Sequence, residues 1–148
     1  MPELPDVLLY IAALKPRIVN QPLERVRLAS PFVLRSVTPP ISALNGQTVI
    51  RIRRLGKQIV FEFADHSFLV IHLMVAGRLQ GKQRAAGIPG KLGLAAFDFP
   101  GGTLLLTEAG SKKRASIRVV RGEQDLAAFD RRALEVLDST VEEFKTEL

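Results

Sequence analysis

The residues that follow the initiator methionine combine two groups capable of covalent chemistry. Pro2 becomes a terminal secondary amine once Met1 is removed, and Glu3 places a carboxylic acid beside it. A neutral secondary amine attacks an aldehydic or glycosidic carbon to form an iminium, and a terminal amine with a pKa of about 8 is partly neutral at physiological pH. The carboxylic acid can exchange protons with the same substrate. The alternative is structural, because Pro2, Glu3 and Asp6 also suit the first turn of a helix.

The elements that must hold this end in place can be predicted from hydrophobic periodicity. Apolar residues recur at helical spacing over about residues 4–19, which indicates an amphipathic helix whose last turn is threatened by Pro16. After that the pattern changes to period two, which is typical of strands. The expected strands are 23–28, 47–54, 58–63, 68–73, 94–99, 103–107 and 115–120. Seven or eight short strands predict a mainly β fold with flanking helices, a two-sheet antiparallel sandwich behind an N-terminal amphipathic helix.

Charge is unevenly distributed along the chain. Residues 1–122 hold 18 Lys or Arg and 7 Asp or Glu, a balance of +11, whereas residues 123–148 hold 3 and 8, a balance of −5. A basic body points to a polyanionic partner, although a merely soluble basic protein has the same composition. Residues 81–93 are rich in Gly, Lys and Arg and are expected to form a mobile basic loop.

Four stretches in the same order resemble the formamidopyrimidine-DNA glycosylase and endonuclease VIII family. The N-terminal MPELPDV is similar to the start of the family, and residues 53–57 resemble its basic turn with a lysine. Residues 71–79, IHLMVAGRL, resemble the strand and loop that the family writes His-Leu-Gly-Met-Ser-Gly. Residues 133–137, ALEVL, resemble the Gly-Pro-Glu-Pro-Leu stretch that ends the family's first domain. The resemblance covers nearly the whole chain.

The resemblance implies a bifunctional enzyme that excises an oxidised base and then nicks the strand by elimination. Pro2 would attack the anomeric carbon as the nucleophile, Glu3 would protonate the sugar ring oxygen, and Lys57 would hold a phosphate beside the lesion. Asp6 would lie near the damaged base, which must leave the stack to expose its sugar. The DNA-binding residues implied in this way are Arg54, His72, Met74, Val75, Arg78, Lys112, Lys113 and Arg114. On the residues alone, Lys57 could be an ordinary turn lysine and His72 a satisfied core histidine.

Two positions depart from the family pattern. The family inserts a methionine, an arginine and a phenylalanine into the gap left by the flipped base. The methionine position aligns with Val75, with Met74 one residue earlier, and residues 110–116 replace the loop that carries the arginine and phenylalanine. These departures leave the preferred lesion and opposite base open.

The family also implies parts that this sequence does not contain. We expect residues 1–148 to form the N-terminal catalytic domain, without the helix–two-turn–helix and zinc-finger domains of full-length relatives. The sequence has no cysteine, so no cofactor is expected in this chain, and zinc is expected in the missing C-terminal domain. A truncated chain would expose an interdomain face through which an otherwise monomeric protein could associate.

The expected partner is damaged double-stranded DNA, in a bacterial cytoplasm and associated with the nucleoid. No apolar stretch is long enough to predict a membrane span, so no membrane partner is expected. Two alternatives remain open at this point. One is a nucleic-acid-binding β-domain of the same family that does not cut, and the other is a small-ligand β-barrel with an enclosed apolar cavity.

Overall fold

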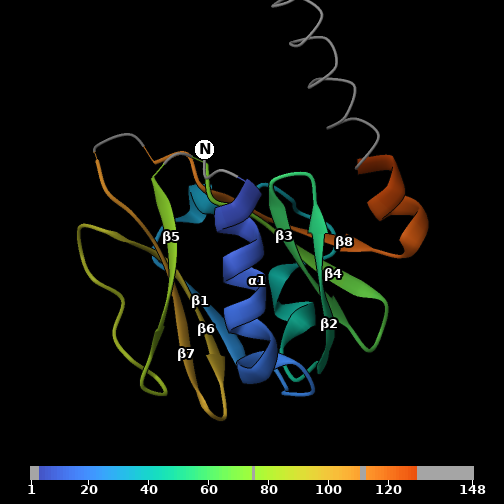
Figure 1. The fold of residues 1–148 in the computed structure, drawn as a ribbon, viewed down its shortest axis with the longest axis horizontal. Helices are drawn as coiled ribbons and strands as arrows, with labels where there is room; N and C mark the ends of the chain where they lie inside the picture. The colour runs from blue at the N-terminus through green and yellow to red at the C-terminus, as the bar shows by residue number, and fades with distance from the viewer. Residues whose placement is uncertain (1–3, 75, 111–112, 130–148) are drawn as a thin grey trace, which may run out of the picture.

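The computed structural model describes residues 4–74, 76–110 and 113–129, which form a sandwich of two four-stranded antiparallel sheets with a helix on its open side (Figure 1). The elements in chain order are α1 (Leu4–Ile18), β1 (Arg25–Leu28), η1 (Pro31–Val33), η2 (Ile41–Leu44), β2 (Val49–Leu55), β3 (Gln58–Phe63), β4 (Ser67–His72), β5 (Gly77–Lys82), β6 (Gly93–Phe99), β7 (Gly102–Glu108) and β8 (Ser116–Arg121). Residues 123–129 are helical. The predicted fold class, a two-sheet antiparallel sandwich with an N-terminal helix, is confirmed.

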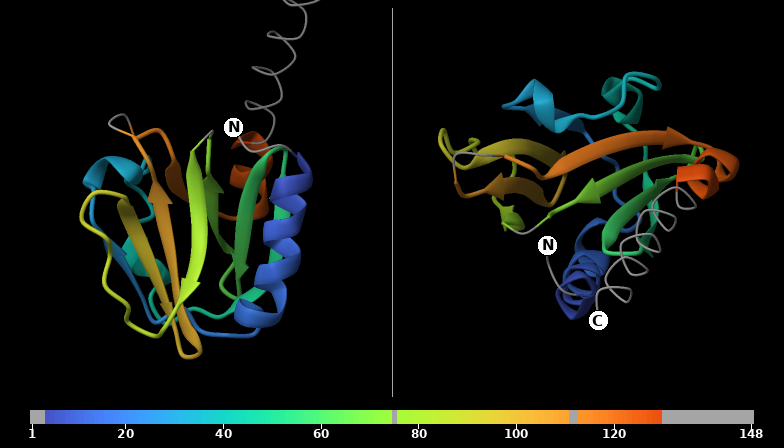
Figure 2. Two further views of the ribbon diagram at one scale, coloured as in Figure 1. Left: turned by 60° about the vertical axis from the view of Figure 1, so that its left-hand side comes forward. Right: turned by 90° about the horizontal axis from the view of Figure 1, so that it is seen from above.

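Helix α1 is amphipathic and closes one side of the sandwich against β2 and β3 (Figure 2). Its buried residues follow the helical spacing and are Val7, Ile11, Leu14 and Ile18. Pro16 lies in the last turn, where one lost backbone donor is tolerated, and the helix continues to Ile18. The length of α1 therefore sets its two ends at opposite ends of the sandwich.

The two sheets have the strand orders β1-β6-β7-β5 and β2-β3-β4-β8. Alternate residues of their strands point inward and form one core with α1, as the period-two pattern predicts. Side chains at the intervening positions of the second sheet, Val60, Phe68, Val70 and Val120, form a smaller cluster with Leu126. The helical segment 123–129 therefore covers the outer face of the second sheet. No helix in the described part of the chain combines the length and apolar character that a membrane crossing needs.

Two local features differ from the expectations drawn from the sequence. Strand β5 was not among the located strands, and its last two residues belong to the segment predicted as a basic loop. The irregular connection is therefore shorter, from residue 83 to 92. In β2 a register shift between Val49 and Arg51 interrupts the period-two alternation of inward and outward side chains expected for this strand. This bulge leaves Ile50 42% exposed while Ile52 is buried.

Candidate nucleic-acid interface

The topology gathers three connections at one end of the sandwich. Residues 55–58 join β2 to β3 within one sheet, whereas residues 73–76 and 109–115 each cross from one sheet to the other. The register places these connections together, because His72 pairs with Ser116 and Gly77 pairs with Glu108. Helix α1 begins at the same end (Figure 1). We call residues 55–58, 73–76 and 109–115 the loop end.

The turn at residues 55–58 carries the cationic side chain of Lys57 and is preceded by a second cation, Arg54. Gly56 has a φ of 61°, a left-handed conformation that glycine adopts without the steric cost of a Cβ. The guanidinium of Arg54 donates from Nη1 to the carbonyl oxygen of Gly56 at 2.9 Å and so braces the turn. Lys57 is half-buried and, within the described residues, has no hydrogen bond or ion pair. The turn therefore offers its ammonium group to an external anion.

His72 ends β4 beside this turn and is predominantly neutral. Burial lowers the pKa of its imidazole below the ordinary value of about 6.5. Its Nε2 atom is buried and has no hydrogen-bond partner among the described residues. A buried polar atom without a partner is costly in a folded protein. A neutral imidazole of this kind can exchange a hydrogen bond with a ligand, but it does not supply a full positive charge.

The connection at residues 73–76 is tightly turned. The amide of Gly77 donates to the carbonyl oxygen of Leu73 at 2.9 Å, and Met74 adopts a φ of 58°. A side chain at position 77 would collide with the backbone, because an added Cβ would lie 2.2 Å from that carbonyl oxygen. Arg78 follows and donates from Nη1 to the carbonyl oxygen of Gly77 at 2.7 Å. Met74 and Arg78 are thus brought to the same end as Lys57.

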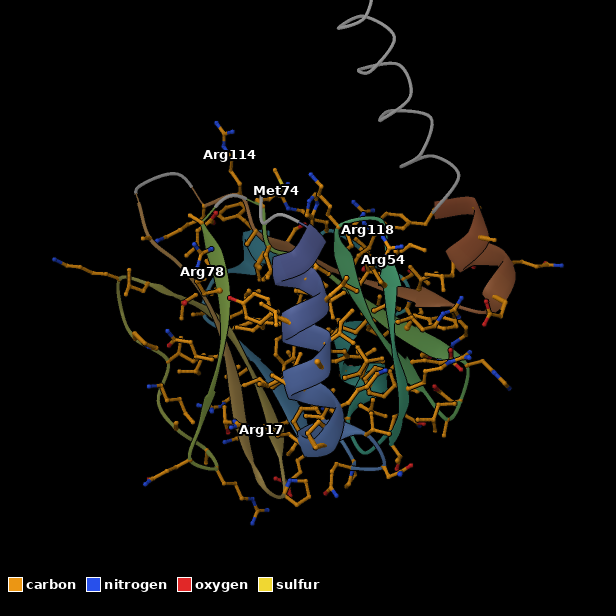
Figure 3. All side chains as sticks on the ribbon, in the orientation of Figure 1. Arg17, Arg54, Met74, Arg78, Arg114 and Arg118 are labelled. Atoms are coloured by element: carbon orange, nitrogen blue, oxygen red, sulfur yellow. The ribbon has the colours of Figure 1, made fainter. Side chains whose placement is uncertain are left out.

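The buried carboxylate of Glu108 organises the base of the second crossover connection. Its Oε1 atom accepts the backbone amides of Arg114 at 2.5 Å and of Ala115 at 3.1 Å. The ammonium group of Lys113 donates to the backbone carbonyl oxygen of Glu108. With its carboxylate occupied in this way, Glu108 holds the chain while the side chain of Arg114 projects into solvent (Figure 3).

Many arginines outside the loop end are neutralised by carboxylates. Asp98 is 2% exposed and accepts hydrogen bonds from Arg25 and Arg27, each at 2.9 Å. Burial alone would raise the pKa of Asp98, but hydrogen bonds from Arg27, Thr103 and Arg25 outweigh it and hold the pKa below its ordinary value. Buried Glu62 similarly pairs with Arg51 at 2.7 Å and Arg53 at 3.2 Å. These four guanidinium groups are committed to the scaffold.

Four cations at or beside the loop end differ from these arginines. Within the described residues, Arg54, Lys57, Arg114 and Arg118 have no carboxylate partner. Arg118, on β8, instead lies over the ring of Phe129 at 5.3 Å. Figure 3 shows Arg54, Arg114 and Arg118 at this end and Arg17 at the other. Sequence reasoning missed Arg118, although its place early in an expected strand, just after the basic residues 112–114, was a usable signal.

The structure brings together a large part of the predicted set. Arg54, Lys57, His72, Met74, Arg78, Lys113 and Arg114 lie at or directly beside the loop end. The predicted residues Pro2, Glu3, Val75 and Lys112 lie outside the described residues, and the side chain of Asp6 is not described either. No group of three His, Asp or Glu side chains within the described ranges is placed to hold a metal ion.

Comparison of the sequence with known proteins identifies the family to which this domain belongs. The family described as "Formamidopyrimidine-DNA glycosylase N-terminal domain" matches residues 1–136. The chain belongs to this family. A formamidopyrimidine-DNA glycosylase of Mycoplasma genitalium is 34% identical over 107 residues, which cover 71% of this chain and 38% of that protein. The corresponding protein of Lactococcus lactis subsp. cremoris is 37% identical over 87 residues, 58% of this chain and 30% of that one.

Solved structures of this family share the fold. The complex between the Lactococcus lactis Fpg and DNA containing an abasic site matches with a TM-score of 0.77 and 26% identity, over 86% of this chain and 47% of that chain. The structure of MutM in complex with DNA containing carbocyclic 8-oxo-G matches with the same TM-score, identity and coverage. The chain thus spans less than half the length of these relatives.

Proposed function

We propose that this chain is the N-terminal catalytic domain of a bifunctional DNA glycosylase and AP lyase that removes oxidised bases in base-excision repair. The observation that carries the proposal is the family match over residues 1–136, a range that includes Pro2, Glu3 and Lys57. The gathering of unneutralised cations at the loop end supports it, because such an end binds the phosphates of a nucleic acid. Relatives crystallised with abasic-site DNA support damaged DNA as the partner.

In the proposed reaction, the N-terminal amine is the nucleophile. Removal of Met1 frees the nitrogen of Pro2, whose lone pair attacks the anomeric carbon while the bond to the damaged base breaks. The attached nitrogen loses its proton while Glu3 protonates the sugar ring oxygen, so that the ring C–O bond breaks, the sugar opens and the nitrogen becomes an iminium. Loss of a proton from the sugar carbon next to the iminium (C2′) then expels the 3′-phosphate, which breaks the strand. Helix α1 begins at Leu4, immediately after these two residues, and would restrict their motion.

The described residues would grip and position the DNA. Lys57 is half-buried in a braced turn and would hold a phosphate beside the lesion. His72 would contribute a hydrogen bond from a predominantly neutral imidazole. Met74 and Val75 would occupy the gap left by the flipped nucleotide, and Asp6 would face the base. Cationic contacts to the DNA would come from Arg54, Arg78, Lys112, Lys113 and Arg114. Lys57 and His72 meet at the loop end because β2 and β4 both finish there.

The proposal is tested by trapping the covalent intermediate. The purified chain is incubated with a duplex that contains one abasic site, in the presence of sodium borohydride, and the iminium is reduced to a stable adduct. Intact mass measurement establishes whether Met1 has been removed.

We expect Pro2→Gly to reduce the adduct by at least about 10-fold, because glycine supplies a primary amine in a different geometry. The matched control Pro5→Ala, which leaves the terminal amine unchanged, should trap like the parent. An undiminished adduct in Pro2→Gly would remove Pro2 from its role.

A second candidate is a nucleic-acid-binding domain that does not cut. It is favoured by residues 110–116, where the sequence GSKKRAS replaces the arginine- and phenylalanine-bearing loop that the resemblance leads one to expect. The same experiment separates the two candidates. A chain with a free Pro2 that binds the abasic duplex but forms no adduct is the non-cutting domain.

A further inference from the structure

An exposed aromatic residue stands on the segment between β1 and β2. Phe32 is 80% exposed, and Val37 farther along the same segment is 89% exposed. Single exposed apolar side chains are common on protein surfaces and need no explanation by themselves. Here two further observations, the rigidity of the segment and its charged neighbours, give Phe32 a role.

The backbone around Phe32 is fixed to both sheets. The amides of Ala29 and Ser30 donate to the carbonyl oxygen of Leu94 at 2.9 and 3.3 Å. Beyond η1, the amide of Arg35 donates to the carbonyl oxygen of Ile117 at 2.9 Å. The adjacent Val33 is buried in the core and anchors the turn. The phenyl ring is thus presented on a rigid support, so that a ligand contacting it would have little backbone entropy to remove.

Two cationic residues lie near the exposed ring, Lys113 of the loop end and Arg35 of the same segment. Phe32 and Lys113 line the same small surface depression, together with Ala115 of the second crossover connection. Figure 2 shows η1 next to this connection. Arg35, on the same segment, is exposed and has no ion pair within the described residues. An aromatic side chain among cations is the combination with which proteins hold unpaired nucleotides, by stacking the base and neutralising the backbone.

We propose that Phe32 is a stacking platform for a nucleobase that has lost its pairing partner, in DNA bound across the loop end. This inference rests on the proposed function, because it takes DNA as the ligand. The connection at residues 109–115 contains no aromatic residue, so Phe32 supplies a ring that this connection lacks. A base opposite an abasic site is the chemically appropriate occupant, since it leaves the stack at low cost.

Two variants of Phe32 test the stacking contact directly. The sequence contains no tryptophan, so Phe32→Trp introduces a single tryptophan whose emission, excited selectively over that of Tyr10, should be quenched when the abasic duplex binds. Phe32→Ala should weaken binding of that duplex about 5- to 100-fold, the range given by base–aromatic stacking. Ile50→Ala is the matched control. It shortens another exposed apolar side chain, which lies near the start of β2, away from the loop end where β2 finishes, and it should leave binding unchanged. A fully paired duplex should lose less affinity on Phe32→Ala than the abasic one.

The outcomes separate this inference from the function on which it rests. Equal affinities of the parent and Phe32→Ala for the abasic duplex, or unquenched emission of Phe32→Trp on binding, would overturn the stacking role alone. Borohydride trapping by Phe32→Ala at saturating protein would show that the chemistry survives the change. Failure of the parent chain itself to bind the abasic duplex would overturn both proposals. Because Phe32 is exposed, thermal unfolding of each variant should match the parent, which excludes misfolding as the cause.

Discussion

At the scale of single residues, two buried carboxylates determine which arginines remain available to bind phosphate. Asp98 engages Arg25 and Arg27, and Glu62 engages Arg51 and Arg53, all across paired strands. A guanidinium held by a buried carboxylate is costly to remove, because the carboxylate would be left without compensation. These arginines therefore stabilise the sheets and are poor candidates for binding phosphate. Arg54, one residue beyond this pattern in β2, lacks such a partner within the described residues and faces the loop end.

The neutral state of His72 gives a prediction about pH and salt. Burial lowers the folded-state pKa of His72, so below about pH 6.5 the unfolded chain binds more protons than the folded chain. The free energy of unfolding should therefore fall as the pH decreases through this range, and less so in His72→Gln. At pH 8 the imidazole carries no charge, so His72→Gln should leave the salt dependence of DNA binding unchanged. Arg114→Gln should lower the slope of log K against log salt by about 0.9, because one phosphate contact is lost.

Nuclear magnetic resonance and binding isotherms check this prediction. The chain has two histidines, and the exposed His66 serves as the internal comparison in the titration. A titration midpoint for His72 above 6.5, or a reduced salt slope in His72→Gln at pH 8, would contradict the neutral assignment.

At the scale of elements, the two crossover connections matter most, because each carries the chain from one sheet to the other at the loop end. Their shape is set by backbone contacts. Gly77 permits the hydrogen bond from its own amide to Leu73, and buried Glu108 fixes residues 114 and 115 through their amides. The positions of Met74 and Arg114 therefore follow from a missing Cβ and a buried carboxylate rather than from local preference.

Gly77→Ala should damage both stability and binding. The added methyl group would lie 2.2 Å from the carbonyl oxygen of Leu73, so the turn must open and its hydrogen bond must lengthen. We expect a loss of about 1–3 kcal/mol in the free energy of unfolding, measured by urea denaturation. DNA affinity should fall as well, because residues 73–76 move. Gly87→Ala is the control, since nothing lies within 4 Å of its added Cβ. Equal losses in the two variants would show that the close approach at Gly77 has no consequence.

Sequence periodicity was sufficient for much of this architecture but not for all of it. Helix α1 ends one residue before its predicted limit, and β3 matches its predicted range, because both have strong periodic patterns. Strand β5 was not predicted, because Gly77 and Gly81 interrupt its period-two pattern and only Leu79 contributes a large buried side chain. The pairing of Arg51 with Glu62 depends on strand register, which no local pattern encodes. The exposure of Phe32 likewise follows from tertiary structure.

The predicted site residues divide in the same way, into those that a local motif identifies and those that no local motif identifies. The resemblance named Lys57, His72 and Arg114 from their motifs, and the topology brings them to one end because the strands that carry them start or finish there. Arg118 was not named, since it belongs to none of the four matching stretches. Roles that depend on Pro2 and Glu3 stay predictions for the trapping experiment.

At the scale of the whole molecule, the balance of +11 over residues 1–122 is less informative than where the unpaired cations lie. Arg114 lies at the loop end with Arg118 beside it, and Arg17 lies in the last turn of α1 at the opposite end (Figure 3). The Debye length is about 10 Å at 0.1 M salt, so charges at the far end are largely screened from a ligand at the loop end. Binding should therefore depend on the position of a charge as well as on net charge.

Charge reversal at the two ends tests this dependence with matched variants. Arg114→Glu and Arg17→Glu change the net charge by the same amount, and both side chains are exposed. Arg114→Glu should weaken binding of an abasic duplex by at least about 10-fold at 0.1 M salt, because a phosphate contact is replaced by repulsion. Arg17→Glu should stay within about twofold of the parent. If both variants lost affinity equally, the duplex would be attracted by overall charge. That result would contradict the inference that the loop end is the binding surface. If Arg17→Glu lost more, the DNA would lie against the opposite end of the sandwich, far from the start of α1 and from the proposed nucleophile.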